Sequence, residues 1–245
     1  MKVFAMKMTK PIHPVHTAAI CLALLSVLGL AVASSQAQDN APRTDNAQPA
    51  DSEIVVGRLV YDNGKTAVCF ADQFLATYAR ETKQNVRRKY AEVKLDSDDL
   101  FELPFVVLSG QEGFELSDQE KKNLKTYIDR GGFVLASAGC SNAAWARSFE
   151  GVMAELYGNK ALTKLDTDHA LFHTVYDIDH VDVRRPGTRH PVQGLVIDGR
   201  VRVVYSPLGL NDTGNAGGEC CCCGGSEIKN ARLINVNVLA YALTH

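Results

Sequence analysis

Two short, almost wholly apolar runs in the middle of the chain flank a segment with helical periodicity. The runs are residues 104–110 (PFVVLSG) and 132–138 (GFVLASA). Apolar runs of this length are typical of strands in a parallel sheet that helices cover on both faces. Between them, Ser117 and Glu120 have the spacing of a capping box, and Gly131 is placed to end the helix. The pattern predicts a right-handed strand–helix–strand unit, whose functional groups should lie beyond the carboxyl ends of its strands.

The same two periodicities predict further elements on both sides of this unit. In chain order they are a strand at 54–61, a helix from Asp72, an exposed strand at 91–95, a helix after Cys140 that ends at Gly158, a hairpin at 192–206 and a helix from about 227 to 244. The hairpin is marked by Asp198-Gly199 between two β-branched runs. The predicted fold is therefore α/β, with a doubly wound, mostly parallel sheet, a C-terminal β-hairpin and a closing helix.

The N-terminal part of the chain has the pattern of an export signal. Lys2, Lys7 and Lys10 precede an apolar run at 17–33, and Ser35-Gln36-Ala37 forms a small-x-small cleavage site. We interpret residues 1–37 as a signal peptide, 38–52 as a disordered linker and 53–245 as one domain. The alternative for the first segment is an uncleaved membrane anchor, for which 17 apolar residues are the minimum length. The expected location is periplasmic or secreted.

The charge of the chain argues against a nucleic-acid partner. Without residues 1–37 the chain would keep 23 basic and 28 acidic residues, a formal charge of −5. Its local basic residues, Arg184, Arg185, Arg189 and His190, are interpreted as a solvated loop. The expected partner is a protein or a small-molecule ligand, and a membrane contact is expected only through an uncleaved N-terminal segment.

Cysteines carry the most specific chemical signal. The chain beyond residue 37 has six, namely Cys69, Cys140, Cys220, Cys221, Cys222 and Cys223. In an oxidising compartment six cysteines allow fifteen complete pairings, so a disulfide cluster that pins the Gly-rich loop is one interpretation. The other is a thiolate site for zinc or copper, because Cys220 and Cys223 have the C-x-x-C spacing that grips one soft ion.

A metal site built on the cysteine run needs partners from elsewhere in the chain. The candidate ligands are Cys140, Cys220, Cys221, Cys222, Cys223 and His169, with Cys69 and His173 as further possibilities. If the strand at 200–206 runs parallel to that at 133–137, the run and Cys140 emerge on the same edge of the sheet. We therefore expect Cys140 to lie near residues 220–223.

Cys140 also supports a catalytic hypothesis. A cysteine between a buried strand and a helix occupies the position of a nucleophile elbow, and a helix N-terminus lowers a thiol pKa. Ala138 and Asn142 stand where the elbow pattern has glycines, which weakens this hypothesis. The available bases and orienting acids are His169, His173, Asp168 and Asp166.

Several runs match a known family in order and spacing. LPFVVLSG, FELSDQEKKNLKTYIDRGGFVLASAGC, AAWARSFEGVMAELYG and LDTDHALFH, followed by GRVRVVYSPLGL and NVNVLAYALTH, closely resemble the bacterial domain-of-unknown-function family numbered 4159. The resemblance spans about residues 53–245. It implies a flavodoxin-like sheet of the class I glutamine amidotransferase-like superfamily and no established reaction. The function we expect is a non-catalytic binding or structural module with a Cys-rich loop; the alternative is a Cys140-dependent hydrolase or amidase, so enzyme activity is left open.

Overall fold

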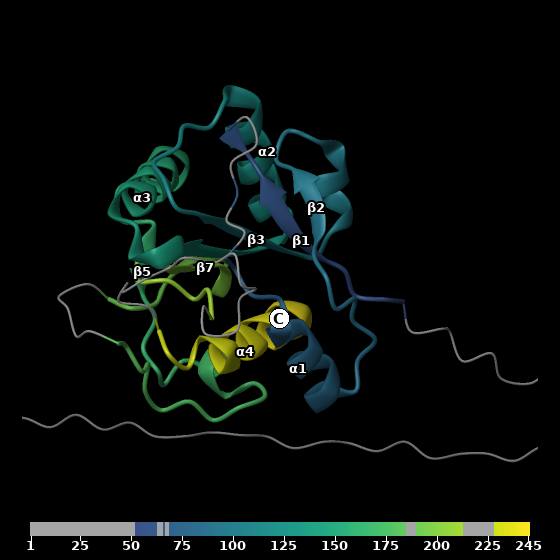
Figure 1. Ribbon diagram of the computed structural model, residues 1–245. Coiled ribbons are helices and arrows are strands. Elements are labelled where there is room, and N and C mark those ends of the chain that lie inside the picture. Colours follow the sequence, from purple (N-terminus) through teal and green to yellow (C-terminus); the bar gives the residue numbers. More distant parts are fainter. Residues whose placement is uncertain (1–51, 63–65, 67–68, 185–189, 213–227) are drawn as a thin grey trace, which may run out of the picture. The chain divides into compact units, whose positions relative to one another are not determined.

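The computed structural model describes residues 52–62, 66, 69–184, 190–212 and 228–245 (Figure 1). Within these residues seven strands form one sheet in the order β2-β1-β3-β4-β7-β6-β5. Their bounds are β1 Val56–Val60, β2 Ala91–Lys94, β3 Phe105–Gly110, β4 Phe133–Ala138, β5 Leu162–Lys164, β6 Gln193–Ile197 and β7 Arg200–Ser206.

Among the described residues, four α-helices cover the two faces of the sheet (Figure 1). They are α1 Gln73–Thr82, α2 Asp118–Asp129, α3 Ala143–Tyr157 and α4 Ala231–Thr244, and short 3₁₀ helices lie at Asp98–Glu102 (η2), Gly139–Ser141 (η3) and Ala170–His173 (η4). Helices α1 and α4 pack on one face, and α2 and α3 pack on the other. The strand order β2-β1-β3-β4-β7, all parallel, is that of a flavodoxin-like sheet, which confirms the predicted fold class.

Alternate side chains of the central strands enter the two cores. Phe105 and Val107 of β3 pack under α1 and α4, whereas Val106 and Leu108 pack under α2 and α3. All four side chains are fully buried. This explains why the central strands are apolar throughout, since neither face of the sheet meets water there.

The predicted ends of α2 and the predicted hairpin are confirmed. The Ser117 side chain accepts from the Glu120 N–H, and the Glu120 carboxylate accepts from the Ser117 N–H at 2.8 Å, so the capping box is complete. Gly131, with φ +98°, follows the end of α2. Strands β6 and β7 pair antiparallel across Asp198-Gly199. Strand β7 runs parallel to β4, which is the condition for Cys140 and the cysteine run to emerge on the same edge of the sheet.

Three sequence predictions differ from the structure or fall outside it. The closing helix begins at Ala231, later than the predicted residue 227. Strand β5 was not predicted, because three residues are too few for an alternating pattern. The predicted signal peptide, nearly all of the linker, Arg185, Arg189 and the four adjacent cysteines lie outside the described residues. In the part of the chain that is described, no helix is long and apolar enough to span a membrane.

Candidate functional site

The turn after the central strand β4 has an unusual backbone. Cys140 (φ 54°, ψ 28°) and Ser141 (φ 55°) both adopt the left-handed conformation, and Asn142 then caps α3 by accepting from two of its N–H groups. A left-handed conformation costs a non-glycine residue on the order of 1–3 kcal/mol, and such residues concentrate at functional sites. Cys140 therefore occupies a constrained position between a buried strand and a helix N-terminus.

Tight packing holds this turn against its neighbours. A Cβ atom at Gly139 would lie 2.8 Å from the carbonyl oxygen of Gly110 and 3.3 Å from Nδ2 of Asn211, so only glycine fits. Cys140 follows Gly139 in the chain, and its sulfur accepts a hydrogen bond from Nε2 of Gln111 at 3.4 Å. The ends of β3 and β4 and the segment after β7 thus meet at Cys140.

Three buried serines lie in register across the carboxyl ends of β3, β4 and β7, and we call them the serine row. Ser109 pairs with Ser137, and Ser137 pairs with Ser206. The Ser137 hydroxyl donates to Oδ1 of Asn211 at 2.5 Å and accepts from the Leu210 N–H at 2.8 Å. These bonds tie the segment after β7 to the end of β4.

Ser206 and Ser109 complete the serine row. The Ser206 hydroxyl accepts from the N–H groups of Leu208 and Gly209, and the Ser109 hydroxyl donates to the carbonyl oxygen of Ser137. Residues 208–211 are consequently held by the side chains of Ser137 and Ser206, which are both fully buried.

Asn211 leaves one polar atom without a partner at this edge. Its Nδ2 is buried and has no hydrogen bond within the part of the chain that the structure describes, although its Oδ1 is paired with Ser137. The backbone carbonyl of Asn211 accepts from the Ala71 N–H, which places the buried Cys69 close to the same edge. An unpaired buried amide costs about 1–3 kcal/mol, so Asn211 is a candidate ligand-binding group.

The two ends of the segment that carries the four cysteines are anchored beside Cys140. The Ser141 hydroxyl donates to the carbonyl oxygen of Leu208 at 2.5 Å, and the Ile228 N–H donates to that of Gly209 at 3.1 Å. Just before the segment, Asp212 forms an ion pair with Arg232 at 2.9 Å. Both ends therefore lie at the carboxyl edge, while the cysteines at 220–223 are outside the described residues.

His169 does not come together with Cys140. Its ring lies 5.7 Å from that of Tyr241, which lies 6.4 Å from the ring of Phe133 at the start of β4, whereas Cys140 follows the end of that strand. A six-residue strand spans about 17–20 Å. His169 therefore lies near the amino ends of the strands, at the opposite edge of the sheet from Cys140.

The segment around His169 is not an α-helix, so His169 and His173 do not share a helical face. His169 caps the 3₁₀ helix η4 by accepting from the Leu171 N–H through Nδ1. His173 pairs with Asp177, while Asp168 precedes His169 at an exposed position and Asp166 pairs with Lys164. These histidines and acids serve local structure. Among the described residues no group of three or more His, Cys, Asp or Glu side chains could hold a metal ion.

Sequence reasoning missed Asn211 and the serine row. A signal was present, because Ser109 and Ser137 are each the penultimate residue of an apolar run, where a hydroxyl would sit at the strand end. The buried Asn237 of α4 serves backbone groups, since its Oδ1 accepts from the N–H groups of Val175 and Tyr176.

We predict that Ser137→Ala destabilises the protein much more than Ser109→Ala. Ser137→Ala leaves the Leu210 N–H and Oδ1 of Asn211 buried without their hydrogen-bond partner, so it should lower the free energy of unfolding by about 2–4 kcal/mol. Ser109→Ala removes only a donor to a carbonyl and should cost about 1 kcal/mol. Urea unfolding of the two variants measures the difference, and equal losses would show that Ser137 does not hold the segment after β7.

The two histidines should titrate on opposite sides of their ordinary pKa of 6.5. Burial lowers the pKa of His169, and the hydrogen bond to Asp177 raises the pKa of His173. The stability that His173 contributes is present below pH 6.5 and is lost as pH rises through its folded pKa. His169 acts oppositely: stability falls as pH drops from 6.5 towards its folded pKa, because only the unfolded chain takes up the proton.

NMR titration of the imidazole resonances measures both histidine pKa values. Asp177→Asn is the matched control, and it should return the pKa of His173 towards 6.5 while leaving that of His169 unchanged. Identical titration of the two rings would contradict the placement described above.

Comparison with known proteins identifies the family. A search of curated proteins found no match. A family model described as a domain of unknown function, DUF4159, matches residues 55–243, which is more than half of the chain and includes every strand and helix described above except the last residue of α4. The chain therefore belongs to the DUF4159 family, whose function is uncharacterised.

Proposed function

We propose that the protein is an exported, non-catalytic binding module whose site lies at the carboxyl edge of β3, β4 and β7. Cys140, whose sulfur is disulfide-bonded in this structure, is its central sulfur; once reduced, Cys140 and the cysteines at 220–223 supply thiolate ligands for a soft metal ion, zinc or copper. The observation that carries the proposal is the anchoring of both ends of the cysteine segment beside the left-handed turn of Cys140.

Chain length supports this arrangement. Cys223 lies five residues before Ile228, and Cys220 lies eight residues after Asp212. At about 3.3 Å per residue, five residues reach roughly 17 Å. Any of the four thiols is therefore within reach of Cys140, and soft thiolate ligands select zinc or copper over hard cations.

The wider assignments are part of the same proposal. Export is supported by the signal pattern of residues 1–37, and N-terminal sequencing of the mature protein should then begin near Gln38. Placement in the class I glutamine amidotransferase-like superfamily is supported by the parallel order β2-β1-β3-β4-β7 and by the sharp strand-to-helix turn at Cys140.

One observation favours a second function, that of a cysteine hydrolase. The left-handed Cys140 between β4 and α3 stands at the position of a nucleophile elbow, and because its sulfur is disulfide-bonded in this structure, a hydrolase would need it reduced. The proposed bases do not support it, since His169 lies on the other side of the sheet and His173 is paired with Asp177. Rapid alkylation of Cys140 alone in the purified protein would favour the hydrolase over the binding module.

We predict that Cys140→Ser abolishes metal binding, whereas His169→Gln does not. The exported wild-type protein should carry about one zinc or copper ion per chain, measured by elemental analysis, because one soft ion takes four ligands. His169→Gln is the matched control, since it changes a candidate ligand on the far side of the sheet.

Two results would contradict the metal proposal. Full metal content in Cys140→Ser would show that Cys140 is not a ligand. The second result is a wild-type protein that contains no metal and keeps a disulfide between Cys140 and one of the cysteines at 220–223. The cysteines would then only cross-link this edge of the sheet and would not bind a metal.

A further inference from the structure

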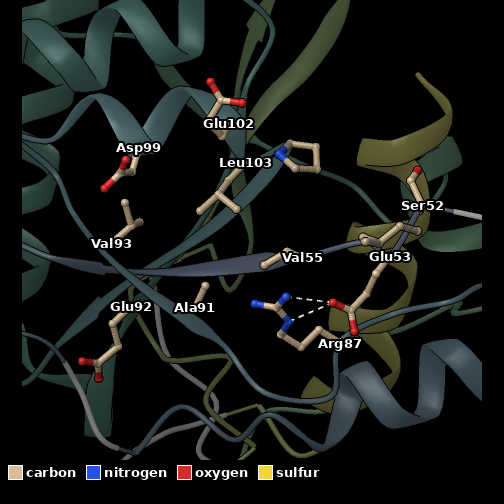
Figure 2. Close-up of a pocket in the computed structure, with 12 residues that line it drawn as sticks. Ser52, Glu53, Val55, Arg87, Ala91, Glu92, Val93, Asp99, Glu102 and Leu103 are labelled. Atoms are coloured by element: carbon tan, nitrogen blue, oxygen red, sulfur yellow. Dashed lines mark hydrogen bonds and ion pairs between the residues drawn. The ribbon is translucent and has the colours of Figure 1, made fainter.

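A cavity lies at the opposite edge of the sheet from Cys140, and we call it the amino-edge cavity. It has a volume of about 560 Å³ and is lined by residues that precede β1 and β3 and by residues of β2 (Figure 2). This volume is within the range of pockets that take small molecules. The amino-edge cavity shares no residue with the proposed sulfur site, so an inference about it stands independently of that proposal.

The floor of the amino-edge cavity is apolar. Figure 2 shows Val93 and Leu103 beside each other, with Val55 next to them. Leu103 packs against the backbone of Gly57, where an added Cβ would lie 2.6 Å from its Cδ1. Val93 is 6% exposed. The floor is thus held in place by the sheet and offers a surface for an aliphatic group.

The charged residues around the floor fall into two classes. Arg87, the basic residue of the lining, is paired with Glu53 at 2.8 and 3.0 Å, as the dashed lines in Figure 2 mark. Glu92 is paired with Arg58 of β1. These charges are already compensated, so the cavity has no cationic group available for an anion.

Asp99 and Glu102 make up the second class. They lie three residues apart on the 3₁₀ helix η2, and Figure 2 shows them on the same side of the apolar floor, with their carboxylates turned in different directions. Both line the amino-edge cavity and are exposed, and neither forms an ion pair within the described residues. Their carboxylates give one wall of the cavity a negative charge above an apolar floor.

We propose that the amino-edge cavity binds a small organic cation made of an ammonium group and a short aliphatic body. The ammonium is placed against Asp99 and Glu102, and the aliphatic body lies over Val93 and Leu103. The residues that precede Ser52 do not complement this wall, because residues 38–51 carry Asp39, Asp45 and Asp51 against the single Arg43. An external cation is the occupant that matches both the charge and the apolar floor.

The test compares three probes that have the same six-carbon body and differ only in the head group. Hexylammonium, hexanol and hexanoate are titrated into the full-length protein, and chemical-shift changes of the Val93 and Leu103 methyl groups are followed by NMR. Hexylammonium should bind about 5-fold more tightly than hexanol, with hexanoate weakest, and added salt should reduce the difference. Equal affinities for the three probes would overturn the proposal.

Variants distinguish the effect of the Asp99 and Glu102 carboxylates on hexylammonium binding from the effect of the overall surface charge. The double change Asp99→Asn with Glu102→Gln should weaken hexylammonium binding about 5-fold and leave hexanol binding unchanged. Asp98→Asn is the matched control: Asp98 is the preceding acid of the same 3₁₀ helix and does not line the cavity. A loss of equal size in Asp98→Asn, or no loss in the double variant, would refute the role of Asp99 and Glu102.

Discussion

The arrangement of the carboxyl edge depends on the Ser137 hydroxyl. This group donates to Asn211 and accepts from Leu210, so one side chain at the end of the central strand fixes the course of the segment after β7. The bonds form because β3, β4 and β7 are parallel and in register, which brings Ser109, Ser137 and Ser206 into one row on one face of the sheet. In a fully buried position each of these polar groups must be paired, and the chain after each strand can therefore take few other paths.

The consequence is a division of the molecule into two chemically different edges. At the carboxyl edge, the serine row, the left-handed Cys140 turn and Nδ2 of Asn211, which has no hydrogen bond within the described residues, lie beside the ends of the cysteine segment. At the amino edge, residues that precede β1 and β3 line a cavity with an apolar floor and two carboxylates, those of Asp99 and Glu102, which form no ion pair within the described residues. The second edge departs from the expectation that open α/β sheets bind ligands at the carboxyl ends of their strands.

The sequence predicted those parts of the fold that local rules control. The apolar runs at 104–110 and 132–138, the capping box at Ser117 and the Asp198-Gly199 hairpin all lie where the patterns place them. The expected approach of Cys140 to the cysteine run required the strand at 200–206 to run parallel to that at 133–137, and β7 and β4 do pair in parallel. Except for the pairing of β4 with β7, each of these features is specified by residues close together in the chain.

Features that depend on distant residues were not predictable in the same way. Ser137 and Asn211 are 74 residues apart, and their contact follows from strand order, which composition does not reveal. His169 was grouped with Cys140 because both are candidate ligands, but the chain after β5 takes His169 to Tyr241 on α4. The amino-edge cavity combines residues from four separate segments, each unremarkable alone.

The most direct test of the central claim is to map the sulfur neighbours of Cys140 by mass spectrometry. Full-length exported protein is blocked with maleimide and digested without reduction, and a second sample is reduced, freed of metal and treated with a short bismaleimide linker before digestion. The account predicts that the peptide containing Cys140 is joined to the peptide containing residues 220–223 in at least one of the two samples. A Cys140 peptide that is modified alone in both samples, or joined only to Cys69, would contradict it.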